Sequence, residues 1–190
     1  RAERRAARVA ACRAALGAQV AKTYELHVTT FPDDENHVAM LQNLVDVLDD
    51  AKSTFEAGRY ALAIADKLPD GAEKQNALYD GLVHLQTALD GPSNRMLRVV
   101  ARAGIRKAGG GLIGSEMKPE RARKVKFAIA ETDFDEGRYD TAIERLNAVA
   151  MEYPATEQGD EAVHLILESY RTLNDYLGLI RAGRRFLDSA

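Results

Sequence analysis

Apolar side chains recur at steps of three and four residues through nearly the whole chain, and this periodicity is the strongest constraint on its fold. Such spacing places the apolar residues on one side of an amphipathic α-helix. No segment shows the sustained apolar–polar alternation, rich in β-branched residues, that is typical of a half-buried strand. The pattern therefore predicts an all-α protein. A clear example is the apolar set Tyr139, Ala142, Ile143, Leu146, Val149 and Ala150.

Proline and glycine divide this periodic pattern into separate helices. Short connections between helices favour antiparallel neighbours. No apolar run approaches the roughly 18 residues that a membrane span needs. We predict helix caps at Asp34, Ser93 and Thr156. We predict about nine helices, near residues 2–28, 35–57, 59–67, 72–89, 93–108, 118–136, 139–152, 157–173 and 175–188.

One phrase occurs twice: FEAGRYALAI at 55–64 and FDEGRYDTAI at 134–143. We interpret the glycine, Gly58 or Gly137, as the end of one helix, where glycine adopts a positive φ at low cost. The tyrosine after it then begins the next helix. Ala63 and Ala142 would lie where the two helices cross most closely, because a small residue allows that approach. The phrase thus predicts a repeated helix hairpin.

The hairpin around Gly137 resembles the tetratricopeptide repeat, a 34-residue helix–turn–helix unit. A unit starting at Arg123 matches the family at several positions, although Val149 replaces a usual alanine. The unit around Gly58 matches less well, because its second helix meets Leu68–Pro69 early. A third unit from about Gly159 places Gly178 at the crossing. The best unit's matching residues are Ala130, Gly137, Tyr139, Ala142, Leu146 and Pro154.

The resemblance implies an α-solenoid of antiparallel hairpins in a single domain spanning residues 1–190. Within it we expect a basic N-terminal helix (1–28) that acts as a cap, degenerate hairpins (35–108), a Gly-rich connector (109–117) and clearer hairpins (118–190). The rhythm of residues 151–187 is also similar to repeats in bacterial envelope proteins, namely outer-membrane assembly lipoproteins and Tol-Pal coordinating proteins. That likeness implies a bacterial protein of the cytoplasm or the cell envelope.

Charge alternates in blocks along the chain. Residues 95–126 carry ten basic groups against two acidic ones, and residues 127–175 carry three against twelve. The first block includes Arg95, Arg98, Arg102 and Arg106, which share one helix face. This stripe could hold phosphates or an acidic peptide, or it could pair with the chain's own acidic helices. The negative net charge of the chain and the lack of aromatic residues among these basic ones argue against binding of nucleic acid.

No constellation in the sequence indicates catalysis or a cofactor. Residues 109–114 satisfy the dinucleotide-binding pattern GxGxxG, but a helix precedes them, whereas a nucleotide loop follows a strand. We expect a flexible connector there. No two of the four histidines are spaced for a shared metal site. The lone Cys12 has no base nearby in sequence and suits a packed thiol. The sequence predicts neither an enzyme nor a bound metal.

The predicted function is therefore a non-catalytic module that binds a partner protein or peptide on its helical surface. The resemblance maps the family's concave groove to Lys124, Phe127, Glu131 and Phe134, although the two phenylalanines could equally belong to the core. Some tetratricopeptide domains bind the acidic tails of chaperones with a lysine and an asparagine on their first helices. This site is not reproduced here, since Leu48 and Lys52 occupy the matching positions. Two alternatives stay open: self-assembly as a homo-oligomer through complementary charged faces, and a regulatory role within a larger enzyme.

Overall fold

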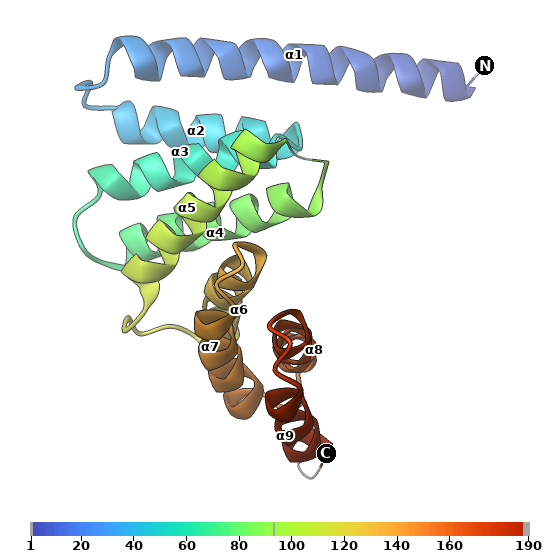
Figure 1. Ribbon diagram of the computed structural model, residues 1–190. Coiled ribbons are helices and arrows are strands. Elements are labelled where there is room, and N and C mark those ends of the chain that lie inside the picture. The colour runs from blue at the N-terminus through green and yellow to red at the C-terminus, as the bar shows by residue number, and fades with distance from the viewer. Residues whose placement is uncertain (1, 93, 188–190) are drawn as a thin grey trace. The chain divides into compact units, whose positions relative to one another are not determined.

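The computed structural model describes residues 2–92 and 94–187, with side chains from residue 15 onward. Within these residues the chain forms nine helices and no strand, which confirms the all-α prediction (Figure 1). The proposed cap Ser93 and the side chain of Cys12 lie outside the described part. The helices are α1 (Ala2–Thr30), α2 (His37–Asp50), α3 (Thr54–Lys67), α4 (Ala72–Asp90), α5 (Arg95–Leu112), α6 (Pro119–Asp135), α7 (Tyr139–Glu152), α8 (Glu157–Thr172) and α9 (Tyr176–Leu187).

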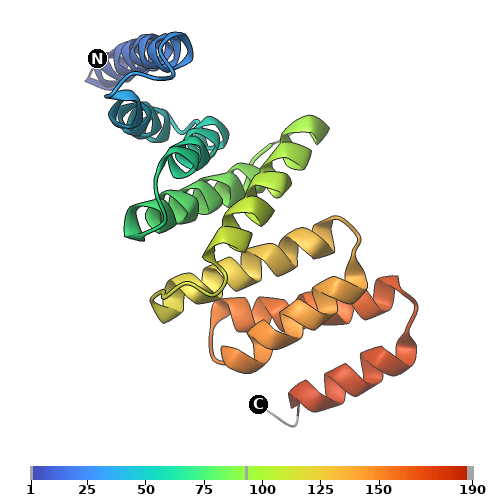
Figure 2. The ribbon, with the colours of Figure 1, turned by 90° about the vertical axis from the view of Figure 1, so that its left-hand side faces the viewer.

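The chain divides into two compact units, residues 1–104 and 105–190. In the first unit, α1 packs on α2, α2 on α3 and α3 on α4. In the second, α6 packs on α7, α7 on α8 and α8 on α9, and α6 also contacts α8 (Figure 2). Contacts between consecutive helices, and between the first helices of successive hairpins, are typical of a helical repeat array. In the described part of the chain, no helix is both long and apolar enough to cross a membrane.

Three of the hairpins reverse direction through the same turn. The residue after each helix's C-cap has a positive φ: 59° at Lys52, 75° at Gly137 and 58° at Asn174. In each turn two backbone amides reach back to the last carbonyls of the helix, as in a Schellman motif. At Gly137 the N–H donates to the Phe134 carbonyl and the next N–H, of Arg138, to the Asp133 carbonyl, both at 2.9 Å. The turn is thus the true structural repeat.

The two copies of the sequence phrase do not share this turn. In the second copy Gly137 lies in the turn and Tyr139 begins α7, as predicted. In the first copy the helix break falls at residues 51–53, so the prediction of a break at Gly58 is wrong. Gly58 and Tyr60 lie inside α3, where the Tyr60 hydroxyl donates to Glu25 on α1 at 2.7 Å. The structural register is offset from the sequence phrase by six residues.

This offset changes which alanine matches Ala142. Ala57 stands five residues after Lys52, just as Ala142 stands five residues after Gly137, and both side chains are fully buried. Ala63, which the phrase predicts at the crossing, is only half-buried. The prediction for Ala142 is therefore confirmed, and its counterpart is Ala57.

Gly58 is needed for close packing rather than for a turn. A Cβ atom at this position would lie 2.7 Å from Cγ of Leu85 and 3.1 Å from the carbonyl oxygen of Gly81, both on α4. A Cβ at Gly81 would likewise lie 3.3 Å from the Gly58 carbonyl oxygen. Two glycines therefore let the backbones of α3 and α4 approach each other directly.

The predicted Gly-rich connector is shorter than expected, because α5 continues through Gly109, Gly110 and Gly111 to Leu112. Gly109 is buried, and a Cβ there would lie 2.4 Å from Cδ1 of Ile129 on α6. Gly114, with φ of 85°, then turns the chain toward α6. A helical context of this kind has no loop that could wrap a pyrophosphate.

The two uses of glycine predict opposite responses to substitution. Lys52→Gly should stabilise the protein by about 1 kcal/mol, because a non-glycine residue in the left-handed region costs about that much. Gly58→Ala should destabilise it by about 1–3 kcal/mol through overpacking against α4. Urea unfolding measures both changes.

Gly110→Ala is the matched control, since Gly110 lies in a helix with no atom within 4 Å of an added Cβ. It should stabilise the protein by about 0.5–1 kcal/mol. A stabilising Gly58→Ala would contradict the close approach of α3 and α4.

Candidate functional site

The predicted groove residues divide between core and surface. Phe127 is 9% exposed and packs in the core of the second unit with residues of α7 and α8. Phe134 is half-buried against the same core, and its ring meets the Tyr139 ring edge-on, with centroids 5.5 Å apart. Lys124 is exposed and Glu131 is half-buried. Of the four predicted groove residues, Lys124 and Glu131 are therefore the ones with a polar side chain at the surface.

The arginine stripe of α5 is engaged in part by the chain itself. Arg95 and Arg98 are exposed, whereas Arg102 and Arg106 are half-buried. Nη1 of Arg106 lies 2.5 Å from Oε2 of Glu136, just beyond the end of α6. Arg98 and Arg102 also interact with other groups of the chain. The stripe could bind a partner or pair with acidic groups of the chain itself, and Arg106 does the second.

Arg106 belongs to a larger charge network at the α6–α7 turn. Its centre is Asp133, whose side chain is 2% exposed. Oδ2 of Asp133 lies 2.5 Å from Nη1 of Arg145, and Oδ1 accepts hydrogen bonds from Arg138. Arg138 also pairs with Glu136. A buried carboxylate is tolerated when cations hold both of its oxygens, so this network fixes the geometry of the turn.

The network also sets the acidity of Glu136. Burial would raise the pKa of this carboxyl group, but hydrogen bonds from Arg106 and Arg138 outweigh burial and lower the pKa below its ordinary value of 4.5. Its charged form is therefore stabilised in the folded protein.

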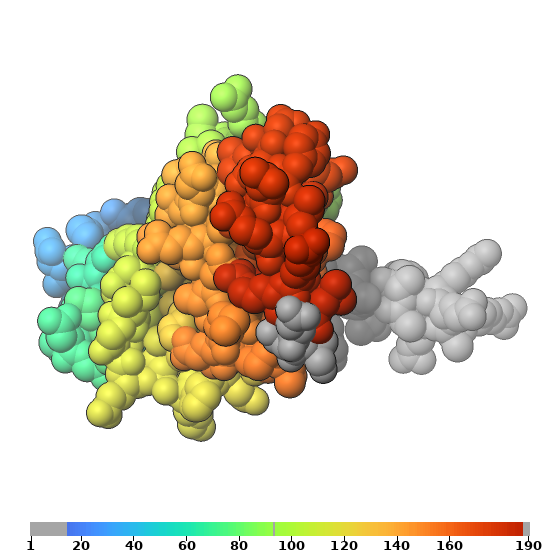
Figure 3. Space-filling view, turned by 60° about the horizontal axis from the view of Figure 1, so that its bottom comes forward, coloured from blue at the N-terminus to red at the C-terminus, as the bar shows by residue number. Residues whose placement is uncertain are grey.

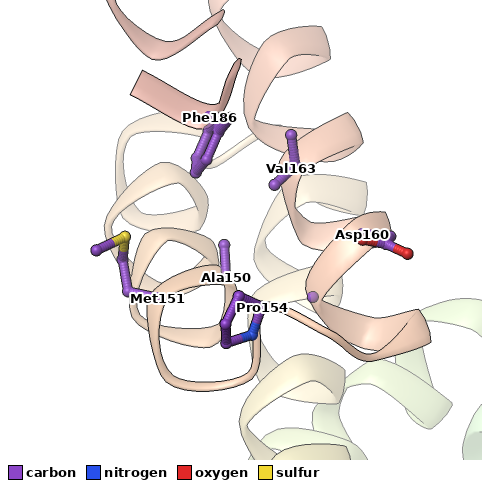
Figure 4. Close-up of a pocket in the computed structure, with 7 residues that line it drawn as sticks. Ala150, Met151, Pro154, Asp160, Val163 and Phe186 are labelled. Carbon is purple, nitrogen blue, oxygen red and sulfur yellow. The ribbon is translucent and has the colours of Figure 1, made fainter. Parts of the chain in front are cut away.

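A pocket of about 360 Å³ opens in the second unit between α7, α8 and α9 (Figure 4). Ala150 and Met151 line it from the end of α7, Val163 from α8 and Phe186 from α9. This volume falls within the range of small ligand sites, about 300–1,000 Å³. The remaining lining residues are Pro154, Gly159 and Asp160.

The junction between α7 and α8 shapes this pocket. Oγ1 of Thr156 accepts a hydrogen bond from the Gly159 amide at 3.2 Å and donates one to the Tyr153 carbonyl at 2.8 Å. This confirms the predicted cap at Thr156. A Cβ at Gly159 would lie 2.1 Å from the Tyr153 carbonyl oxygen, so only glycine fits there. The same glycine leaves the pocket wall without a side chain.

Apolar groups remain exposed on the pocket lining and along α9. Met151 on its lining is 61% exposed, and Leu187, next to Phe186, is 79% exposed. On α9, Leu177 and Ile180 are 73% and 51% exposed. Figure 3 shows atoms of α7 (orange) and of α8 and α9 (red) exposed on one face of the molecule. The pocket thus opens beside a helix with an uncovered apolar side.

The chemistry available in the pocket is that of binding. Asp160 is the single ionisable residue among those lining it. No group of three or more histidine, cysteine, aspartate or glutamate side chains suited to a metal occurs in the described part of the chain. A lone carboxylate beside apolar groups can orient a bound cation or hydrogen-bond donor.

This pocket has no signature in the sequence. Its residues come from three helices and one junction, and no periodicity of a single segment brings them together. The nearest signal in the sequence is Thr156, which predicts the start of a helix but not a pocket beside it. Neither a family model nor a curated protein matches the chain.

The charge network predicts a pH-dependent stability. Because the folded-state pKa of Glu136 is lowered, its contribution is present above the unfolded-state pKa and is lost as the pH falls through the folded-state value. Glu136→Gln should destabilise the protein by about 1–3 kcal/mol at pH 7. Urea unfolding at pH 7 and pH 3 should show a smaller acid-induced loss for the variant than for the wild type. Equal losses would contradict the role of Glu136.

Proposed function

We propose that the protein is a non-catalytic interaction module that binds a partner protein or peptide on its helical surface. The observation that carries this proposal is the open apolar pocket between α7, α8 and α9. Surface pockets lined by apolar groups with one polar residue are common sites for the anchor side chain of a partner. Met151 suits the lining of such a pocket, since its flexible side chain adapts to the shape of a bound side chain.

The helical repeat arrangement of the second unit supports the same function. Stacked hairpins present rigid, extended surfaces while burying a continuous core. The resemblance of residues 123–156 to a tetratricopeptide repeat is consistent with this function and remains a hypothesis about family. Fold alone does not assign a function, so the pocket carries more weight than the resemblance.

Self-assembly through complementary charged faces is the alternative. Part of the basic block 95–126 pairs within the chain, as at Arg106–Glu136 and Lys126–Glu152, each 2.5 Å apart. These pairs reduce the charge available to a second copy. If charge drives assembly, light scattering should show a mass that falls as salt rises. A mass independent of salt would exclude this alternative.

A photo-cross-linking amino acid at position 151 tests the main proposal. It should capture a partner that the same group at position 96 does not capture, although Met96 on α5 is also exposed, at 71%. The purified partner should then bind Met151→Gln about tenfold more weakly, because loss of one apolar anchor costs about 1.4 kcal/mol. Isothermal titration calorimetry measures this change.

Met96→Gln is the matched control and should bind the partner like the wild type. Lys124→Glu tests the surface of α6 predicted from the sequence, where Phe127 belongs to the core and would report on folding instead. Equal affinity of the wild type and Met151→Gln would reject the pocket as the binding site.

A further inference from the structure

We propose that the pocket receives a bulky apolar side chain from a basic segment of the partner, with a neighbouring lysine or arginine of that segment paired to Asp160. This inference rests on the proposed function and names the chemistry of the partner. It combines two observations: the apolar lining of the pocket and the sign of the charge around it.

The segment that forms two of the three pocket walls is entirely acidic in its charged groups. Between Arg145 and Arg171 the chain has no lysine or arginine, but it has five acidic residues. They are Glu152, Glu157, Asp160, Glu161 and Glu168. A surface of one sign attracts and orients a partner of the opposite sign.

The chain neutralises some of these acids but leaves others for a partner. Glu152 pairs with Lys126, and Glu168 pairs with Arg171. Nδ1 of His164 lies 3.9 Å from Glu161. Among the described residues, Glu157 and Asp160 have no ion-pair partner, and both are exposed in the first turn of α8. Of these two carboxylates, Asp160 lines the pocket.

The α8 N-terminus does not cancel this charge. A helix N-terminus is equivalent to about half a positive charge. The two carboxylates Glu157 and Asp160 together carry a larger charge of opposite sign. A cation of the partner beside Asp160 therefore meets a net negative field.

α9 carries three arginines, Arg181, Arg184 and Arg185, and the last of them contacts α7. Arg185 bonds to the Asn147 amide oxygen on α7, and its guanidinium group stacks 4.7 Å from the centre of the Phe186 ring. The charged groups of α9 are thus basic, whereas the charged residue of the pocket lining, Asp160, lies on α8. This polarity sets the orientation of the bound segment, with its cation toward α8.

The apolar part of the site accepts an anchor of leucine or phenylalanine size. Ala150 is small, and Gly159 has no side chain, so the space between Val163 and Phe186 stays open (Figure 4). Burial of one such side chain contributes about 1.5–3 kcal/mol. The anchor supplies affinity, while the charge pair selects the partner.

Three synthetic peptides test the inference on the full chain. The first carries one leucine flanked by lysines, the second carries the same leucine flanked by glutamates, and the third has alanine in place of leucine between lysines. Methyl NMR of the methionines follows binding at the pocket, since Met151 reports on it and Met40, Met96 and Met117 serve as internal controls. The lysine–leucine peptide should shift the Met151 signal in a saturable way.

Its affinity should exceed that of each of the other two peptides by about tenfold. Asp160→Lys should abolish the preference for lysine over glutamate. Asp50→Lys, the same change on an exposed residue of α2, should leave the preference intact.

Equal affinity for the lysine and glutamate peptides, or an unchanged preference in Asp160→Lys, would overturn the charge assignment while leaving the interaction function in place. A Met151 signal that no peptide moves would overturn the apolar anchor. A Met151 signal that moves with protein concentration, without peptide, would identify a second copy as the occupant and also overturn the inference. The proposed function is tested separately, by whether a cross-linker at position 151 captures a partner that a cross-linker at position 96 does not.

Discussion

The fold depends on a left-handed backbone conformation at one residue in each of three hairpins. At Lys52, Gly137 and Asn174 this conformation ends a helix, and its two hydrogen bonds to the preceding turn send the chain back along its own path. The next helix then packs on the one before it. At Gly137 the turn is held further by the charge network around Asp133, so backbone geometry and electrostatics act on the same few residues.

Much of this architecture could be predicted from the sequence because helix periodicity is a local property. The all-α class and most helix boundaries follow from apolar spacing and from breaks such as Pro69 and Pro154. The register of the first hairpin could not be predicted, because glycine serves two needs that look alike in a sequence. Gly137 provides a positive φ, whereas Gly58 provides the absence of a Cβ against α4. Lys52 occupies the turn in the first copy, and nothing in its residue type indicates that.

The candidate site was less predictable than the fold, for a physical reason. The resemblance to a tetratricopeptide repeat maps groove positions onto a single helix, and one of them is Phe127, whose side chain packs inward. The pocket instead depends on where three helices end relative to one another. That arrangement is set by the cap at Thr156 and by the packing of Phe186 on α7 and α8. Contacts between residues far apart in the sequence cannot be inferred from the spacing of residues within one helix.

The two roles of Gly159 have a consequence for how binding could diverge among variants of this protein. The residue that keeps the pocket wall bare also allows the α7–α8 junction to close, so any side chain there would damage the hairpin before it altered a ligand's fit. Selectivity is therefore free to evolve at Met151 and Asp160, whose exposed side chains are not needed for that closure. The residue at the α7–α8 junction is thus fixed by the fold, whereas the residues at the edge of the pocket can change with the partner.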